Sequence, residues 1–106
     1  DQFGQPTNAN DLAEAILKII ETEPKTYGIF HFSNYPETTW FEFAQKIAEF
    51  SGSKIRLNAI TTEKFPTPAK RPKRSTMSLD KIEETYKIEL KHWENTLEEC
   101  IETLQK

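Results

Sequence analysis

The stretch Thr38-Thr39-Trp40-Phe41-Glu42-Phe43-Ala44 predicts a helix and the residue at which it begins. Thr39 and Glu42 have the spacing of a capping box, in which the hydroxyl accepts from the amide three residues on and the carboxylate reaches back. Apolar side chains recur at helical spacing as far as Ser51-Gly52, a typical helix end. We therefore expect a helix over residues 39–51 whose packing stripe contains Trp40, Phe43, Ala44, Ile47 and Phe50.

The same periodicity predicts three further helices on either side of this one. We expect Asn8 or Asn10 to cap the first of them and Ser78 to cap the second, because short polar side chains are preferred at N-caps. By the spacing of their apolar residues, the three helices span residues 8–22, 79–86 and 92–105.

Two short apolar runs, residues 27–32 and 54–60, favour strands, whereas residues 61–75 hold three prolines and favour an ordered loop. So few strands cannot form an independent sheet. We therefore expect an α/β chain that is mainly helical, with at least one strand that extends the sheet of another domain.

The composition excludes several classes of partner. With 14 basic and 17 acidic side chains, the net charge of −3 gives no overall attraction to nucleic acid or anionic lipid. No apolar run approaches the roughly 20 residues of a membrane span. One cysteine excludes an internal disulfide, so a reducing compartment such as the cytoplasm fits best.

Five side chains of versatile chemistry are expected to be structural. Cys100 lies on the apolar stripe of the last helix, which predicts a buried, inert thiol. Trp40 and Trp93 also lie on helix stripes and are expected in the core rather than against a ligand. Neither His31 nor His92 has a partner at a metal-ligand spacing.

Catalytic machinery for a nucleotide cofactor is missing from the sequence. None of the three glycines belongs to a G-x-G-x-x-G turn or a P-loop. No tyrosine is followed four residues later by the lysine that short-chain dehydrogenases use: Tyr27, Tyr35 and Tyr86 precede His31, Thr39 and Leu90 at that spacing. We expect these residues alone to bind no cofactor and to catalyse no reaction.

The densest basic cluster is Lys70-Arg71-Pro72-Lys73-Arg74. It is compatible with a solvated loop, with a nucleic-acid patch, or with a clamp for a diphosphate, whose oxygens a planar guanidinium can bind in parallel. Near the start, Gln2-x-Gly4-x-Pro6-Thr7 is either a turn or a segment where Gly4 lets the backbone approach a ligand. Asp11 is expected to support the first helix through its dipole.

The order of these motifs resembles the last third of the dTDP-4-dehydrorhamnose reductase family, which are extended short-chain dehydrogenases. The resemblance combines the Gln-x-Gly-x-Pro-Thr opening, the Thr-Thr-Trp helix, a Pro-x-Pro-Ala-x-Arg-Pro-x-x-Ser loop, Leu79-Asp80 and the late Trp93. It implies a C-terminal fragment of a Rossmann-type fold. Residues 1–106 would be a single sugar-nucleotide-binding piece, with the dinucleotide-binding domain absent.

The resemblance also implies a reaction and a set of contacts. The parent enzyme would reduce dTDP-6-deoxy-L-lyxo-4-hexulose to dTDP-L-rhamnose with NADPH or NADH, for surface polysaccharide. The partners implied are a dTDP-sugar and the missing N-terminal Rossmann domain, and a second copy of the chain is left open. Arg71 would bind the diphosphate, and the other implied substrate-binding residues are Gln2, Thr7, Ala69 and Ser75.

Two other interpretations remain open from the sequence. The regulatory β subunit of methionine adenosyltransferase resembles the same regions and uses its fold as a non-catalytic binding module. A free-standing helical interaction domain would explain the helices but not the order of the motifs. The Pro-x-Pro-Ala before Arg71, and Trp40 after Thr39, favour the reductase.

Overall fold

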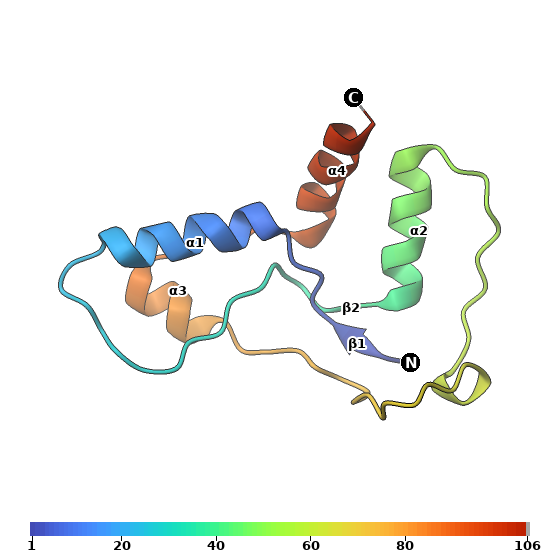
Figure 1. Ribbon diagram of the computed structural model, residues 1–106, viewed down its shortest axis with the longest axis horizontal. Coiled ribbons are helices and arrows are strands. Elements are labelled where there is room, and N and C mark those ends of the chain that lie inside the picture. The colour runs from blue at the N-terminus through green and yellow to red at the C-terminus, as the bar shows by residue number, and fades with distance from the viewer. Residues whose placement is uncertain (106) are drawn as a thin grey trace.

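Four helices and one two-stranded sheet make up the computed structural model, which describes residues 1–105 (Figure 1). The molecule is flat and open, with extents of 50 × 37 × 20 Å. In this view α1 and α3 lie to the left of the short sheet and α2 to its right, while α4 stands between α1 and α2 and packs on α2. The chain after α2 runs around the outside. The elements are β1 (Phe3–Gly4), α1 (Ala9–Glu21), β2 (Thr38–Thr39), α2 (Trp40–Ser51), the 3-10 turn η1 (Thr62–Lys64), α3 (Asp80–Tyr86) and α4 (Trp93–Leu104).

Two of the N-caps expected from the sequence, at α1 and α2, are observed in the structure. Asn8 caps α1, because its side-chain oxygen accepts from the amides of Asn10 and Asp11. The Thr39 hydroxyl accepts from the amide of Glu42 at 3.2 Å, which confirms that half of the capping box. The carboxylate of Glu42 instead accepts from the Thr38 hydroxyl at 2.6 Å.

Of the other two expected helix ends, the one at Gly52 is confirmed and the one at Ser78 is not. Gly52 ends α2 in the left-handed conformation (φ 75°), as expected for a glycine past a helix end. Ser78 as the cap of α3 was wrong, because the N-cap is Leu79 and no side chain bonds the free amides there. At α4 the cap is His92, whose Nδ1 accepts from the amide of Glu94 at 3.2 Å, so this histidine has the structural role expected of it.

Neither expected strand forms within the described residues. Residues 27–32 and 54–60 carry no strand, because no neighbouring segment of residues 1–105 supplies the cross-strand hydrogen bonds. The sheet that does form joins β1 and β2 in antiparallel order, with Phe3 opposite Thr39 and Gly4 opposite Thr38. Strands β1 and β2 are thus paired in space although helix α1 lies between them in the sequence.

The apolar core has two parts. Between α1 and α3, Ala15 packs with Ile82, Tyr86 and Ile88, and the Tyr86 hydroxyl donates to the carbonyl of Thr26 at 2.6 Å. Between α2 and α4, the rings of Phe43 and Trp93 meet edge to face at 5.9 Å. Trp93 is 4% exposed, which confirms the core role expected of it.

The buried thiol expected at Cys100 was wrong, because Cys100 is exposed. Helix α4 packs on α2 through Trp93 and buries Ile101, but the side of the stripe that carries Cys100 and Leu104 stays exposed. These two residues instead line an open cavity of about 520 Å³ between α4 and the start of α1.

A long apolar surface stays exposed beside the first core. Helix α1 buries Ala15 but leaves Ile16 and Ile20 in solvent, and the extended segment that follows leaves Tyr27 and Ile29 exposed. We call this set, completed by Leu12 and Leu17, the α1 apolar face. Among residues 1–105, no helix has the length and apolar character that crossing a membrane requires.

Candidate functional site

A cavity of about 370 Å³ lies where β1, β2, the first turn of α2 and the segment 71–75 meet. Its walls come from three separate parts of the sequence. The lining residues are Gln2, Phe3, Gly4, Gln5, Pro6, Thr7, Thr38, Thr39, Trp40, Phe43, Arg71, Pro72 and Ser75.

Backbone hydrogen bonds hold the basic segment against the start of the chain. The amide of Phe3 donates to the carbonyl of Lys73 at 2.7 Å, and the amide of Ser75 donates to the carbonyl of Phe3 at 2.9 Å. Together they form a parallel bridge between Phe3 and Arg74. Strand β1 therefore lies between β2 and residues 73–75, and each neighbour contributes a wall of the cavity.

Gly4 lines the cavity, and it also packs closely against Ser75. A Cβ on residue 4 would lie 3.1 Å from the Ser75 hydroxyl oxygen. The absence of a side chain at Gly4 therefore lets residues 73–75 lie directly against β1.

Of the five residues that the resemblance implied for substrate binding, four line the cavity and one does not. Gln2, Thr7, Arg71 and Ser75 are in the lining, whereas Ala69 is exposed outside it and its carbonyl accepts from the Thr67 hydroxyl. Three of the four already bond within the chain. The Gln2 amide donates to the Thr62 hydroxyl, and the hydroxyls of Thr7 and Ser75 donate to the carbonyls of Gln5 and Phe3.

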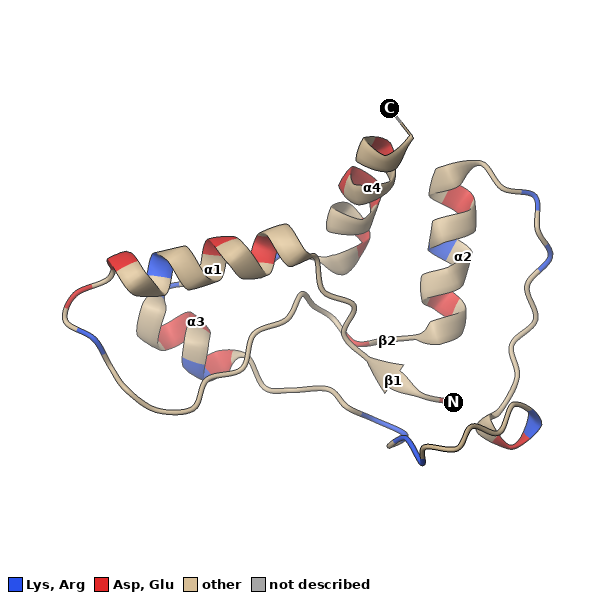
Figure 2. Ribbon diagram, viewed as in Figure 1, with Lys and Arg blue, Asp and Glu red and all other residues tan. Residues whose placement is uncertain are grey.

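Arg71 differs from its neighbour Arg74 in what its guanidinium touches. Arg74 pairs with Glu37 at 3.1 Å, and its guanidinium carbon lies 4.7 Å from the centre of the Phe3 ring. The Arg71 guanidinium makes no hydrogen bond or ion pair with any residue in 1–105, and its residue lines the cavity. The blue segment along the lower edge of Figure 2 is this basic stretch. Its one cavity-lining cation is thus free to bind an anion.

The tryptophan of α2 was expected in the core, and that expectation was wrong. Trp40 is 68% exposed and lines the cavity. It is the first residue of α2, and side chains on a helix lean toward its N-terminus, so this ring projects past the end of the α2–α4 contact. Phe43, one turn on, packs on Trp93 in its place.

The two threonines before Trp40 also line the cavity, although Thr39 was expected only to cap the helix. Thr38 is 4% exposed, bonds the Glu42 carboxylate and lines the cavity from β2. The signal that could have found them is the helix start itself, because the turn before an N-cap places polar side chains and free amides at one end of a helix.

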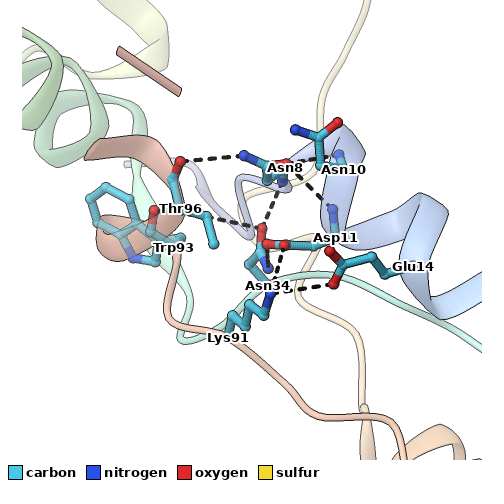
Figure 3. A network of polar contacts seen from close by, with 8 residues as sticks. All are labelled: Asn8, Asn10, Asp11, Glu14, Asn34, Lys91, Trp93 and Thr96. Atoms are coloured by element: carbon cyan, nitrogen blue, oxygen red, sulfur yellow. Dashed lines mark hydrogen bonds and ion pairs between the residues drawn. The ribbon is translucent and has the colours of Figure 1, made fainter. Parts of the chain in front are cut away.

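A buried polar network lies behind the cavity and fixes two of its walls (Figure 3). Asn34, which is fully buried, accepts from the amide of Asn8 at 2.6 Å and donates to the carboxylate of Asp11 at 2.9 Å. Its oxygen also accepts from the Thr96 hydroxyl at 3.4 Å. Asn8 directly follows the wall residue Thr7, and Asn34 is four residues before the wall residue Thr38.

Asp11 therefore has a larger part than the helix-dipole support expected of it. Its carboxylate is 7% exposed and pairs with Lys91 at 3.4 Å, while Lys91 also bonds Glu14 at 3.3 Å. The hydrogen bond to Glu14 and the charge of Asp11 raise the pKa of Lys91 above its ordinary value. These pairs join α1 to the segment that leads into α4, as Figure 3 shows.

No group of three or more metal-ligating side chains occurs in residues 1–105. What the described residues do provide is an apolar-walled cavity with polar groups at its edge and one free guanidinium, an arrangement typical of a domain that binds an organic anion. The chain belongs to the family described as the RmlD substrate binding domain, whose model matches residues 1–106.

Comparison with individual proteins agrees with this family. A dTDP-4-dehydrorhamnose reductase of Sinorhizobium fredii (strain NBRC 101917 / NGR234) is 35% identical over 105 residues, which cover 91% of this chain and 36% of that protein. The spore coat polysaccharide biosynthesis protein SpsK of Bacillus subtilis (strain 168) is 39% identical over 102 residues, covering 96% of this chain and 35% of SpsK. The chain thus spans about a third of the length of the curated relatives it matches.

Two solved structures share the fold. A crystal structure of a dTDP-4-dehydrorhamnose reductase from Clostridium acetobutylicum superposes with a TM-score of 0.92 at 39% identity, over 100% of this chain and 37% of that one. A reductase of the same name from Bacillus anthracis, solved in complex with NADP, gives 0.87 at 33% identity, over 99% of this chain and 36% of that one. These matches confirm a mostly helical part of an extended short-chain dehydrogenase fold.

Proposed function

We propose that this chain is the sugar-nucleotide-binding part of an NAD(P)H-dependent dTDP-4-dehydrorhamnose reductase. The protein that contains it would reduce the 4-keto group of dTDP-6-deoxy-L-lyxo-4-hexulose to give dTDP-L-rhamnose. Support comes from the family match over residues 1–106 and from relatives of that name. Because the chain spans about a third of those relatives, the remaining two thirds would supply the rest of the active site.

The observation that carries the proposal is the free guanidinium of Arg71 in the cavity wall. A diphosphate carries two negative groups that need charged donors, and a planar guanidinium can give two parallel hydrogen bonds to them. The neighbouring Pro72 restrains the backbone at that point, which lowers the entropy lost when the side chain is ordered on a ligand. Arg71 is therefore our candidate for the diphosphate ligand.

The other lining residues would position the ligand rather than react with it. Gln2 offers an amide beside β1, and Thr7 and Ser75 hold the backbone of the same wall through their hydrogen bonds. Holding a substrate at a fixed place and orientation is a large part of catalysis when another group delivers the reacting atoms.

The described residues do not fit a nicotinamide cofactor. Of the three glycines, Gly4 is packed against Ser75, while Gly28 and Gly52 lie at exposed positions far apart in the sequence, so no glycine-rich phosphate cradle forms. We derive no hydride or proton transfer from this chain. We place the cofactor in the other part of the longer protein, and a relative has been solved in complex with NADP.

The α1 apolar face is our candidate contact with that other part. Leu12, Ile16, Leu17 and Ile20 on α1, with Tyr27 and Ile29 after it, are all exposed, and so many large apolar side chains in water indicate a contact surface. The extended segment 27–32 has no partner strand within residues 1–105. Both features are explained if the segment extends the sheet of the Rossmann domain and α1 covers that sheet.

The proposed function is tested by NADPH oxidation in the full-length protein that carries this chain. We expect turnover with dTDP-6-deoxy-L-lyxo-4-hexulose and none with the free deoxy-hexulose, which lacks the diphosphate that Arg71 would bind. Absence of turnover in a folded protein that binds NADPH would contradict the reductase proposal and would favour a non-catalytic binding relative.

A further inference from the structure

Trp40 is the exposed aromatic ring of the cavity. It is 68% exposed, whereas Trp93, the other tryptophan, is 4% exposed. Its ring meets Phe43 at 6.2 Å with an angle of 68° between the planes, so Phe43 supports the ring and leaves most of it open. A large apolar ring in water costs free energy that no neighbour in residues 1–105 recovers.

We propose that Trp40 is the platform on which the nucleobase of the bound sugar nucleotide stacks. This inference rests on the proposed function and adds the part of the ligand that this end of the cavity recognises. An indole face attracts any planar base, and such contacts contribute to binding without reading the hydrogen-bond pattern of the base. Thr39 caps α2 directly before Trp40 and so fixes the backbone that carries the ring.

Two different chemistries in one cavity favour a nucleotide over a simple phosphate or a simple sugar. Arg71 supplies a free cation, and Trp40, Phe3, Phe43 and Pro72 supply apolar surface. A nucleoside diphosphate carries a planar base at one end and charged oxygens next to it. An inorganic phosphate would leave Trp40 unused, and a neutral sugar would leave Arg71 unused.

The base, rather than the hexose, is the ring assigned to Trp40 because of where the reaction must occur. The keto carbon of the hexose has to reach the nicotinamide, and the described residues offer no cradle for that cofactor. The hexose end of the ligand must therefore point toward the other part of the longer protein. The base lies at the opposite end of the diphosphate, against the wall that this chain builds alone.

The experiment compares two ligands on wild type and Trp40→Leu full-length protein. The ligands are dTDP and dihydrothymidine diphosphate, whose saturated base keeps its carbonyls and N–H but is no longer planar. We expect Trp40→Leu to weaken dTDP binding about tenfold, the scale of one lost stacking contact, and to remove most of the preference for dTDP over the dihydro ligand. The affinity of Trp40→Phe for dTDP should fall between those of wild type and Trp40→Leu, because phenylalanine keeps a smaller aromatic face.

Two control variants separate stacking from other effects. Phe65→Leu removes another aromatic ring that is also 68% exposed but does not line the cavity, and should change neither affinity. Arg71→Ala should weaken both ligands by the same factor, because both carry the diphosphate.

Three results would overturn the inference, and only the last of them would also overturn the proposed function. If Trp40→Leu binds dTDP as well as wild type, Trp40 does not touch the base. If it weakens both ligands equally, Trp40 acts through packing and not through stacking. In either case dTDP still binds and the proposed function stands, whereas failure of the wild-type protein to bind dTDP would overturn both.

Discussion

At the scale of single residues, Arg71 and Arg74 show what sequence can and cannot reveal about a basic cluster. Both lie in the same five-residue stretch, but Arg74 is occupied by Glu37 and the Phe3 ring, while Arg71 lines the cavity with its guanidinium free. Composition indicates an anion site but not which cation is available. That choice depends on Glu37, a residue far away in the sequence that β2 brings near.

Asn34 gives a prediction about stability, because its side chain bonds both the start of α1 and α4. Asn34→Ala leaves the amide of Asn8 without its partner and removes one of the two partners of the buried Asp11 carboxylate, which should cost about 3 kcal/mol of unfolding free energy. The matched control is Ser33→Ala, since Ser33 is equally buried but its hydroxyl has no hydrogen-bond partner within residues 1–105. That change should be neutral or stabilising. Equal losses in denaturant unfolding of the two variants would contradict the role given to Asn34.

Lys91 predicts how stability changes with pH. Its pKa is raised in the folded chain, first by the hydrogen bond to Glu14 and then by the charge of Asp11. A raised folded-state pKa gives stability that is fully present below the unfolded pKa and is lost as the pH rises through the folded pKa. We expect unfolding free energy to fall above the ordinary lysine value of 10.5. Lys91→Met should flatten that fall and Lys54→Met, at an exposed site, should not; identical pH profiles for wild type and Lys91→Met would refute the assignment.

At the scale of elements, helices could be predicted from the sequence and strands could not. A helix bonds within itself, so apolar spacing and a cap such as Asn8 or Thr39 suffice to place it. A strand needs a partner, and residues 27–32 have none among the described residues despite their apolar, aromatic composition. The two-residue strands β1 and β2 carry no such signal, because their pairing depends on how α1 folds back.

Helix α4 provides a prediction at this scale. Trp93 is the contact that fixes α4 on α2, so Trp93→Ala should lower the free energy of unfolding by about 3–5 kcal/mol through lost burial and a cavity. Leu104→Ala on the same helix removes a side chain that is 78% exposed and should stay within about 0.5 kcal/mol of wild type. A neutral melting shift for Trp93→Ala would show that the α2–α4 contact does not depend on this ring.

At the scale of the whole molecule, the open shape and the α1 apolar face support the proposal that this chain is part of a larger protein. The chain spans about a third of its relatives, and helix α1, which carries most of the α1 apolar face, lies apart from α2 (Figure 1). The ordered motifs predicted the family correctly. Four of the five implied site residues line the cavity, but Ala69 does not, and Trp40 was assigned to the core because a helix stripe gives no sign of where the neighbouring helix ends.

The central claim is that this chain binds the sugar nucleotide and the rest of the protein binds the cofactor. A substitution of Arg71 tests this claim most directly. The measurement is the affinity of full-length Arg71→Ala for dTDP-L-rhamnose and, separately, for NADPH, with Lys70→Ala as the control for a neighbouring cation outside the cavity. We predict that Arg71→Ala weakens sugar-nucleotide binding by about 1.5–3 kcal/mol, as for a lost charged hydrogen bond, and leaves NADPH affinity unchanged. Equal losses for both ligands, or no loss for either, would contradict the account.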